Sequence, residues 1–152
     1  MIDRYAREKE LAKQLVEKSC KIKPNEKVLI TYSDTPTSFV ERLVEIIAEK
    51  KATPFVYRLD KILKRKLLLT SNNNSINAYK KIVEPIMKDM DAVILIAGSF
   101  NDYELSDIPT DILNLYQKNY VEPIHFKIRC SKKWVLLRYP TPTFAHSCQM
   151  SS

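Results

Sequence analysis

The sequence predicts a single α/β domain, Rossmann-like, in which a mostly parallel sheet of about four strands is flanked by helices. The chain has 152 residues, which is the length of one average domain. Short runs of β-branched and aromatic residues alternate with longer segments of helical periodicity, a pattern typical of βαβ units. Segments of that length allow the right-handed crossovers that parallel strands need. The expected strands lie at 28–32, 53–59, 92–97 and 134–139.

The chain opens with a helix, a turn and a strand. Residues 3–20 are charged and carry apolar residues at helical spacing, which predicts the first helix. The segment 21–26 contains proline and asparagine, so a turn is expected there. Val28–Tyr32 is a short β-branched and aromatic run, the first strand.

The second helix has the clearest apolar face in the sequence. Ser38 with Glu41 fits a capping box at its start, and Thr35 before Pro36 would also serve as a cap. The apolar face is predicted to consist of Val40, Leu43, Val44, Ile47 and Ala48.

The middle of the chain predicts a strand, two helices and another strand. After the strand at 53–59, residues 60–69 form a basic helix and 71–75 a polar loop. Apolar residues from Ile76 to Met90 keep a helical period, which Pro85 should kink or divide. Residues 92–97 are apolar almost without interruption, as in a strand buried on both faces.

The last third predicts a helix and a final strand. Between Asp107 and Lys133 we expect helix, with interruptions at Pro109 and Pro123. The strand at 134–139 follows and ends at prolines. We assign residues 1–138 to the α/β domain and 139–152 to a junction.

Composition excludes several classes of protein. Gly98 is the only glycine, whereas the Walker A loop and the dinucleotide fingerprint each need two or three. The longest apolar runs, Ala92–Gly98 and Trp134–Leu137, are far shorter than the about 20 residues that span a bilayer, and the N-terminus shows no secretory signal. Three widely spaced cysteines favour a reducing, cytoplasmic location over a disulfide scaffold.

The net charge of +7 is concentrated in the middle of the chain. Residues 52–90 carry 8 basic and 3 acidic side chains, with a cluster at Lys61, Lys64, Arg65 and Lys66. Clustered cations can mark a nucleic-acid footprint, although a solvated basic helix face gives the same pattern and is the reading we favour. Lys80, Lys81 and Lys88 follow on the next helix.

No catalytic or metal-ligating set is predicted in this chain. His125 and His146 lack a neighbouring acid or second histidine at ligand spacing, and His146 with Cys148 would face apart on a helix. Asp102, Glu104 and Asp107 form an acidic loop, which we interpret as solvated. The site-residue prediction is therefore none for catalysis and none for metal.

The final segment resembles a known junction. Lys133-Trp134-Val135 leads into Tyr139-Pro140-Thr141-Pro142 and then to Ala145 and Met150-Ser151. This order resembles thermophilic-type metallo-aminopeptidases of the M29 family, where a tryptophan-bearing strand runs into Tyr-Pro-Thr-Pro before the next domain. The segment Ile22–Ile30 is similar to the family's opening, and Asp91–Ile94 resembles its central strand.

The resemblance implies the N-terminal domain of an enzyme that removes N-terminal residues from peptides. It implies two divalent ions (Zn, Co or Mn) held by a C-terminal domain, with no ligand matched in this chain. It also implies that the full-length enzyme is a cytoplasmic homodimer. Two departures are noted: Asn25 stands where the family usually has glycine, and no acid lies near His146.

Two other functions are compatible with the residues. One is a stand-alone α/β binding module that uses the basic middle segment for an anionic ligand or nucleic acid. The other is a structural domain without a ligand. Salt-dependent binding to generic DNA or RNA would favour the first of these.

Overall fold

The structure is a computed structural model that describes residues 3–98 and 105–139. The strands are β1 (Lys27–Ser33), β2 (Thr53–Arg58), β3 (Ala92–Ala97) and β4 (Lys133–Arg138). The helices are α1 (Arg4–Lys13), α2 (Thr37–Glu49), α3 (Lys61–Leu69), α4 (Asn73–Asp89) and α5 (Thr110–Tyr116). π-Helical segments continue α1 and α5, namely η1 (Gln14–Ser19) and η2 (Gln117–Ile128), and a 3-10 turn (η3, Arg129–Ser131) precedes β4.

The four strands form one fully parallel sheet in the order β2-β1-β3-β4. Leu29 of β1 lies opposite Phe55 of β2 and Val93 of β3. The predicted α/β class and the four predicted strands are therefore confirmed, with helices as the crossovers between parallel neighbours.

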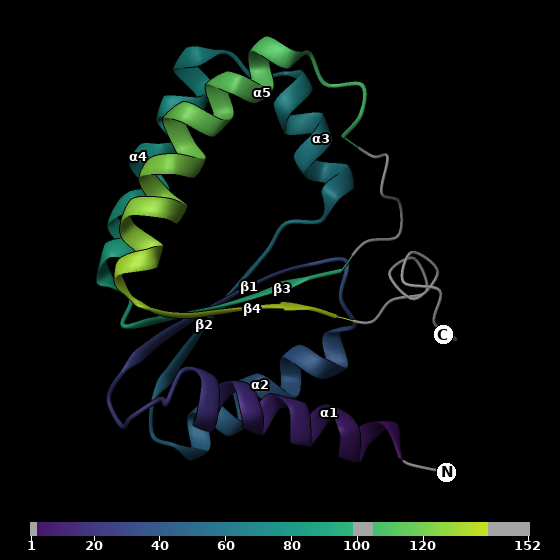
Figure 1. Ribbon diagram of the computed structural model, residues 1–152, viewed down its shortest axis with the longest axis vertical. Helices are drawn as coiled ribbons and strands as arrows, with labels where there is room; N and C mark the ends of the chain where they lie inside the picture. The colour runs from purple at the N-terminus through teal and green to yellow at the C-terminus, as the bar shows by residue number, and fades with distance from the viewer. Residues whose placement is uncertain (1–2, 99–104, 140–152) are drawn as a thin grey trace.

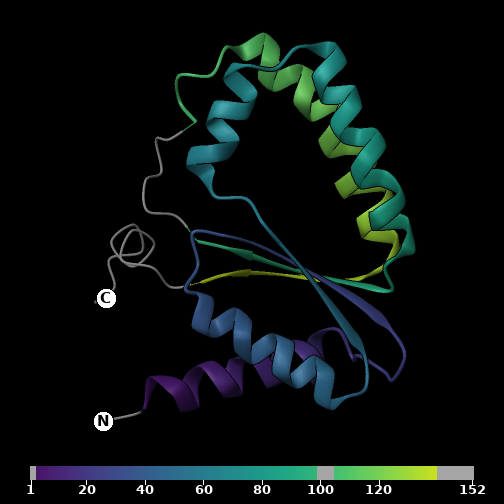
Figure 2. The same ribbon diagram turned by 180° about the vertical axis from the view of Figure 1, so that it is seen from behind.

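Helices cover both faces of the sheet (Figures 1 and 2). α1 and α2 lie on one face, where Val28, Ile30 and Ile94 of the strands meet a buried stripe of the helices. The predicted face of α2 is correct at Val40, Leu43 and Ile47 and wrong at Ala48, which is exposed. The full stripe of α2 is Phe39, Val40, Leu43, Ile46 and Ile47.

The opposite face is covered less completely by the described residues. Leu29 and Val93 form a smaller cluster with residues of α4 and η2. Towards the two edge strands, four large apolar side chains on this face remain between 41% and 50% exposed, namely Phe55, Tyr57, Trp134 and Leu136. The guanidinium carbon of Arg129 lies 4.6 Å from the ring centroid of Trp134.

Two helix starts differ from the prediction. α2 begins at Thr37 without a side-chain cap, because Pro36 occupies the cap position. Ser38 lies inside the helix, where its hydroxyl donates to the Glu8 carboxylate of α1 at 3.1 Å. The predicted loop 71–75 is shorter, since α4 begins at Asn73. Asn72 and Ser75 form a reciprocal capping box there, in which each side chain accepts from the other's backbone N–H.

Proline interrupts the helices less than predicted. α5 begins directly after Pro109, as expected, but Pro85 lies inside an undivided α4 and Pro123 inside η2. Proline removes one hydrogen bond from a helix. In α4, the burial of Ile76 before the proline and Met87 after it offsets that loss.

Asn25 occupies the left-handed region of backbone space, with φ 68°. Asparagine adopts this conformation more readily than most residues, and glycine does so without strain. The turn therefore retains the geometry for which a glycine would be used, and the Asn25 N–H donates to the Lys51 carbonyl at 2.9 Å.

Tyr139 fixes the chain at the end of β4. Its N–H donates to the Ala97 carbonyl at 2.9 Å, its ring packs 5.1 Å from that of Phe39, and its hydroxyl donates to Glu8 at 2.9 Å. Tyr139 and Glu8 are both buried. The junction predicted to be extended, Tyr139–Ala145, otherwise lies outside the described residues, and so does the rest of 140–152.

Candidate functional site

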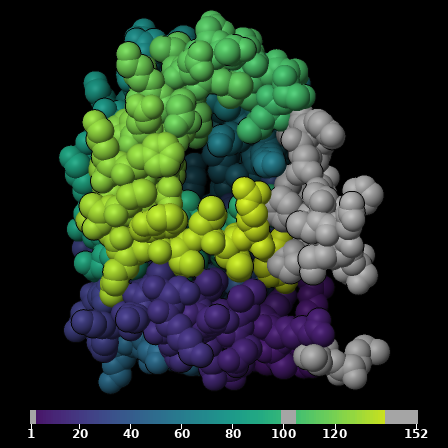
Figure 3. Space-filling view, viewed as in Figure 1, coloured from purple at the N-terminus to yellow at the C-terminus, as the bar shows by residue number. Residues whose placement is uncertain are grey.

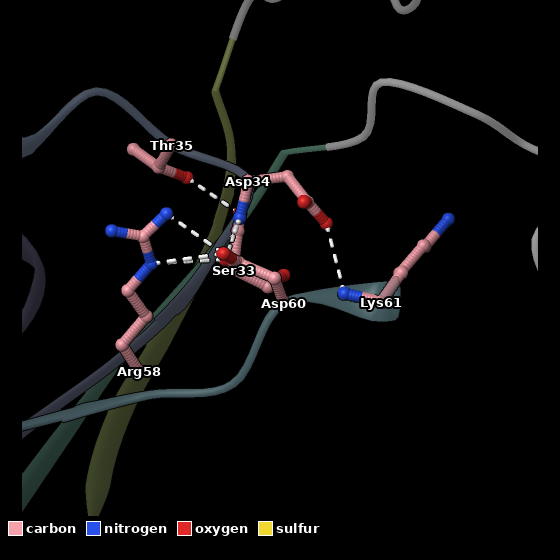
Figure 4. A network of polar contacts seen from close by, with 6 residues as sticks. All are labelled: Ser33, Asp34, Thr35, Arg58, Asp60 and Lys61. Carbon is pink, nitrogen blue, oxygen red and sulfur yellow. Dashed lines mark hydrogen bonds and ion pairs between the residues drawn. The ribbon is translucent and has the colours of Figure 1, made fainter. Parts of the chain in front are cut away.

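The carboxyl ends of β1 and β2 carry a closed polar network (Figure 4). The Asp34 N–H donates to the Asp60 carboxylate at 2.8 Å, and the Asp34 carboxylate accepts from the Lys61 N–H at 3.2 Å. Arg58 holds Asp60 through two nitrogens, with distances of 2.7 and 3.0 Å. Each carboxylate therefore serves the local backbone or a guanidinium.

The two carboxyl groups have opposite electrostatic environments. Hydrogen bonds from Arg58 hold the pKa of Asp60 below its usual value. Burial raises the pKa of Asp34, partly offset by the hydrogen bond from Lys61. Asp34 also has a left-handed backbone, φ 49°, at the point where the chain leaves β1.

Gly98 brings the end of β3 against this network. Its N–H donates to the Ser33 carbonyl at 2.8 Å. A Cβ atom at position 98 would lie 2.1 Å from the carbonyl oxygen of Asp34, so only glycine fits there. In open α/β sheets, ligands bind outside the carboxyl ends of the strands where the strand order reverses, here between β1 and β3. At this position the backbone of Gly98 lies directly against that of Asp34.

The histidine that the structure describes, His125, is half-buried, and it belongs to no group of three or more candidate metal ligands among the described residues. Burial lowers the pKa of His125 to about 4, assisted by Arg129 and Lys64, so the ring is neutral at pH 7. Its Nδ1 has no hydrogen-bond partner, and the ring lies edge-on to Tyr120 with centroids 5.9 Å apart. His146 lies outside the described residues.

The predicted acidic loop and the cysteines do not combine into a site within 3–98 and 105–139. Asp107 pairs with Arg65 of α3, and this ion pair lowers its pKa; Asp102 and Glu104 are not described. Cys20 is buried, which raises its pKa to about 11, whereas Cys130 is exposed. Cys148 also lies outside the described residues.

The basic middle segment is divided between two helices and partly neutralised. Arg65 pairs with Asp107, and Lys88 pairs with Glu84 at 2.9 Å. Lys64 lies beside Tyr116, with its ammonium 5.1 Å from the ring centroid. The cluster that the sequence suggested as an anion footprint therefore does not present all its cations on one open face.

A tyrosine-rich cavity lies between the sheet and the helices of its second face. It is partly open to solvent and has a volume of about 410 Å³ when the open solvent in front of it is included, and Figure 3 shows the surface hollowed between α5 and β4. Tyr116 and Tyr120 stack with centroids 5.1 Å apart, and Tyr79 meets Tyr120 edge-on at 6.4 Å. The lining residues are Tyr57, Leu59, Lys64, Leu67, Leu68, Ser71, Ile76, Tyr79, Tyr116 and Tyr120.

Sequence reasoning did not identify this cavity. The spacing of Tyr116 and Tyr120 places them on one face of a helix, and this spacing was a sequence signal for an aromatic wall. Tyr57 and Lys64 come from β2 and α3, and only the tertiary fold brings these segments to α4, α5 and η2.

The fold places the chain among α/β proteins with a parallel sheet and helices on both of its faces. The family model described as "Thermophilic metalloprotease (M29)" matches residues 5–151. The chain therefore belongs to the M29 family of thermophilic metalloproteases, and the resemblance stated above is confirmed.

A solved structure shares the fold. It is wild-type AmpT from Thermus thermophilus, with a TM-score of 0.66 and 18% sequence identity. The match covers 94% of this chain and 38% of that chain, so the present chain spans less than two fifths of the length of this relative. No curated protein matches the chain.

M29 membership implies divalent metal ions, and the described residues do not fit such a site. In the ranges 3–98 and 105–139, no group of three or more His, Cys, Asp and Glu side chains could hold a metal ion. The neighbouring acids Asp34 and Asp60 are already engaged by N–H groups and by Arg58. No helix in the described part of the chain is long and apolar enough to cross a membrane.

Proposed function

We propose that this chain is the N-terminal, non-metal-binding domain of a metallo-aminopeptidase, an enzyme that releases N-terminal amino acids from peptides by metal-dependent hydrolysis. One observation carries the proposal: the M29 match extends over residues 5–151, yet the chain covers only 38% of the Thermus relative. A two-metal hydrolase needs several ligands that converge on both ions. The proposal assigns these ligands, and two Zn, Co or Mn ions, to a C-terminal domain.

In this proposal the domain forms part of the wall and entrance of the substrate cavity. The half-exposed apolar side chains of β2 and β4 support it, because such a sheet face is normally covered in a complete protein. We place the domain at residues 1–138 and the junction at 139–152. The anchoring of Tyr139 to Ala97 and Glu8 supports that boundary, since it sets where the chain leaves the sheet.

The proposal includes a homodimer with a Rossmann-like domain in each subunit, acting on peptides in the cytoplasm. Cys20 and Cys130 are unpaired, which is compatible with a reducing compartment. Light scattering coupled to gel filtration would measure the subunit number of the complete enzyme.

The decisive experiment compares residues 1–152 with the longer gene product that the proposal expects. Calorimetry with Zn²⁺ and Co²⁺ and a leucyl-amide hydrolysis assay should show neither stoichiometric binding nor turnover for residues 1–152, with a full-length M29 enzyme as positive control. The gene should encode, after Ser152, a segment rich in carboxylates and histidines, and the longer product should hydrolyse the substrate. Micromolar stoichiometric binding with hydrolysis by residues 1–152 alone would contradict the proposal.

A further inference from the structure

The tyrosine-rich cavity combines an aromatic wall with a single lysine. Three of its four tyrosines pack ring against ring, and their hydroxyls make no hydrogen bond to a described residue. Burial and the neighbouring phenols raise the pKa of Tyr120, and burial raises that of Tyr116 to about 12, so both stay protonated at pH 7. The wall therefore offers apolar ring faces and neutral hydroxyl groups.

Lys64 supplies the cavity's positive charge. No carboxylate of the described residues lies within ion-pair distance of its ammonium. Burial, with a smaller contribution from Lys61, lowers its pKa, which means that the ammonium has lost hydration without gaining an acidic partner. An anionic group on a ligand would restore the missing interaction.

The lining also indicates which ligands would not be recognised. It contains no aspartate or glutamate, so it offers no partner for a ligand's ammonium group. A ligand ring that lies among Tyr79, Tyr116 and Tyr120 brings a nearby carboxylate to Lys64, whose ammonium is 5.1 Å from the Tyr116 ring centroid. The cavity thus matches an aromatic ring joined to a carboxylate through a short linker.

We propose that this cavity binds aromatic carboxylates, and specifically the C-terminal aromatic residue of a short peptide, with the ring among Tyr79, Tyr116 and Tyr120 and the carboxylate on Lys64. The choice of a peptide as the source rests on the proposed function, because an aminopeptidase engages the amino end of its substrate at the metal and leaves the carboxyl end free. The aromatic-carboxylate chemistry rests on the cavity alone.

The test is a binding titration with the full chain at pH 7, followed by NMR or calorimetry, and needs no hydrolysis. The probes are N-acetylphenylalanine, its uncharged amide, the dipeptide Ala-Phe, and 3-phenylpropionate as a free acid. N-acetylphenylalanine should bind about tenfold more tightly than the amide, because a hydrogen bond to a charged group distinguishes them. Ala-Phe should bind at least as well as 3-phenylpropionate.

Two variants and one control locate the site. Lys64→Met should remove the preference for acid over amide while the amide still binds, and Leu67→Trp should block all probes because its larger side chain fills part of the cavity that Leu67 lines. Lys66→Met changes an exposed lysine of the same helix and should bind like the wild type. Thermal melts confirm that each variant is folded.

Equal binding of acid and amide, an unchanged preference in Lys64→Met, or no binding of any probe would overturn the proposal. Binding of 3-phenylpropionate without binding of Ala-Phe would overturn the peptide assignment and leave a free aromatic acid as the ligand. These results are distinct from failure of the proposed function, which is decided by metal binding and hydrolysis.

Discussion

Replacing Gly98 with alanine should destabilise the protein by about 2–4 kcal/mol. The new Cβ would lie 2.1 Å from the Asp34 carbonyl oxygen, 2.8 Å from its carbon and 3.1 Å from the Ser33 oxygen. All three are backbone atoms, which cannot rotate away as a flexible side chain would. The end of β3 must therefore move away from the end of β1.

The magnitude has two sources. Overpacking of a tight contact costs about 1–3 kcal/mol. Displacement of β3 also weakens the 2.8 Å hydrogen bond from the Gly98 N–H to Ser33, a loss of about 1 kcal/mol. For a domain of this length, each kcal/mol lowers Tm by about 2–4 °C, so a fall of about 5–15 °C is expected.

Urea unfolding of the variant and the wild type measures this directly. Gly98→Val should be less stable still, because the clash grows with side-chain size. Asn25→Gly introduces a glycine where the backbone is left-handed (φ 68°), the reverse of removing one at position 98. This variant should be neutral or stabilising by up to about 1 kcal/mol. A Gly98→Ala variant within about 0.5 kcal/mol of wild type would refute the steric argument.

Three further predictions concern the network, a buried pair and nucleic acid. Tyr139→Phe removes one hydrogen bond to the buried Glu8 carboxylate and should lower the unfolding free energy by about 1.5–3 kcal/mol in urea titrations, whereas the exposed Tyr5→Phe should be neutral. Because Arg58 lowers the pKa of Asp60 in the folded state, the stabilising contribution of Asp60 is present above about pH 4 and decreases as pH falls further. In unfolding curves measured at decreasing pH, the difference in unfolding free energy between the wild type and Asp60→Asn should therefore shrink. A difference that stays constant with pH would contradict this. The chain should show no salt-dependent binding to generic DNA or RNA in anisotropy titrations, and a steep salt dependence would restore the nucleic-acid alternative.

The sheet was predictable because its signals are local. Ala92–Ala97 is apolar at every position, and like β1 it has helices on both faces and a strand on each side. The amphipathic period of α2 likewise predicted most of its buried stripe. Membership of the M29 family was predictable from the Trp134–Pro142 segment.

The remaining features depend on tertiary contacts that no window of sequence contains. Ser38 has the residue type and spacing of a cap, but the helix begins before it, at Thr37, and its hydroxyl donates to Glu8 of another helix. Pro85 carries a helix-breaking signal that burial of its neighbours overrides. The cavity requires Tyr57 and Lys64 to meet Tyr116 across three elements, so its residues look unrelated along the chain.

Trp134 is the single tryptophan of the sequence, and it is 42% exposed on the incompletely covered face of the sheet. Fluorescence excited at the red edge of indole absorption therefore comes from one known place, beside Arg129 and within β4, the strand that leads to Tyr139. A polypeptide that covers this face should exclude water from the indole and shift its emission to shorter wavelength. The fluorescence of Trp134 can therefore report the binding of a polypeptide to the incompletely covered face of the sheet.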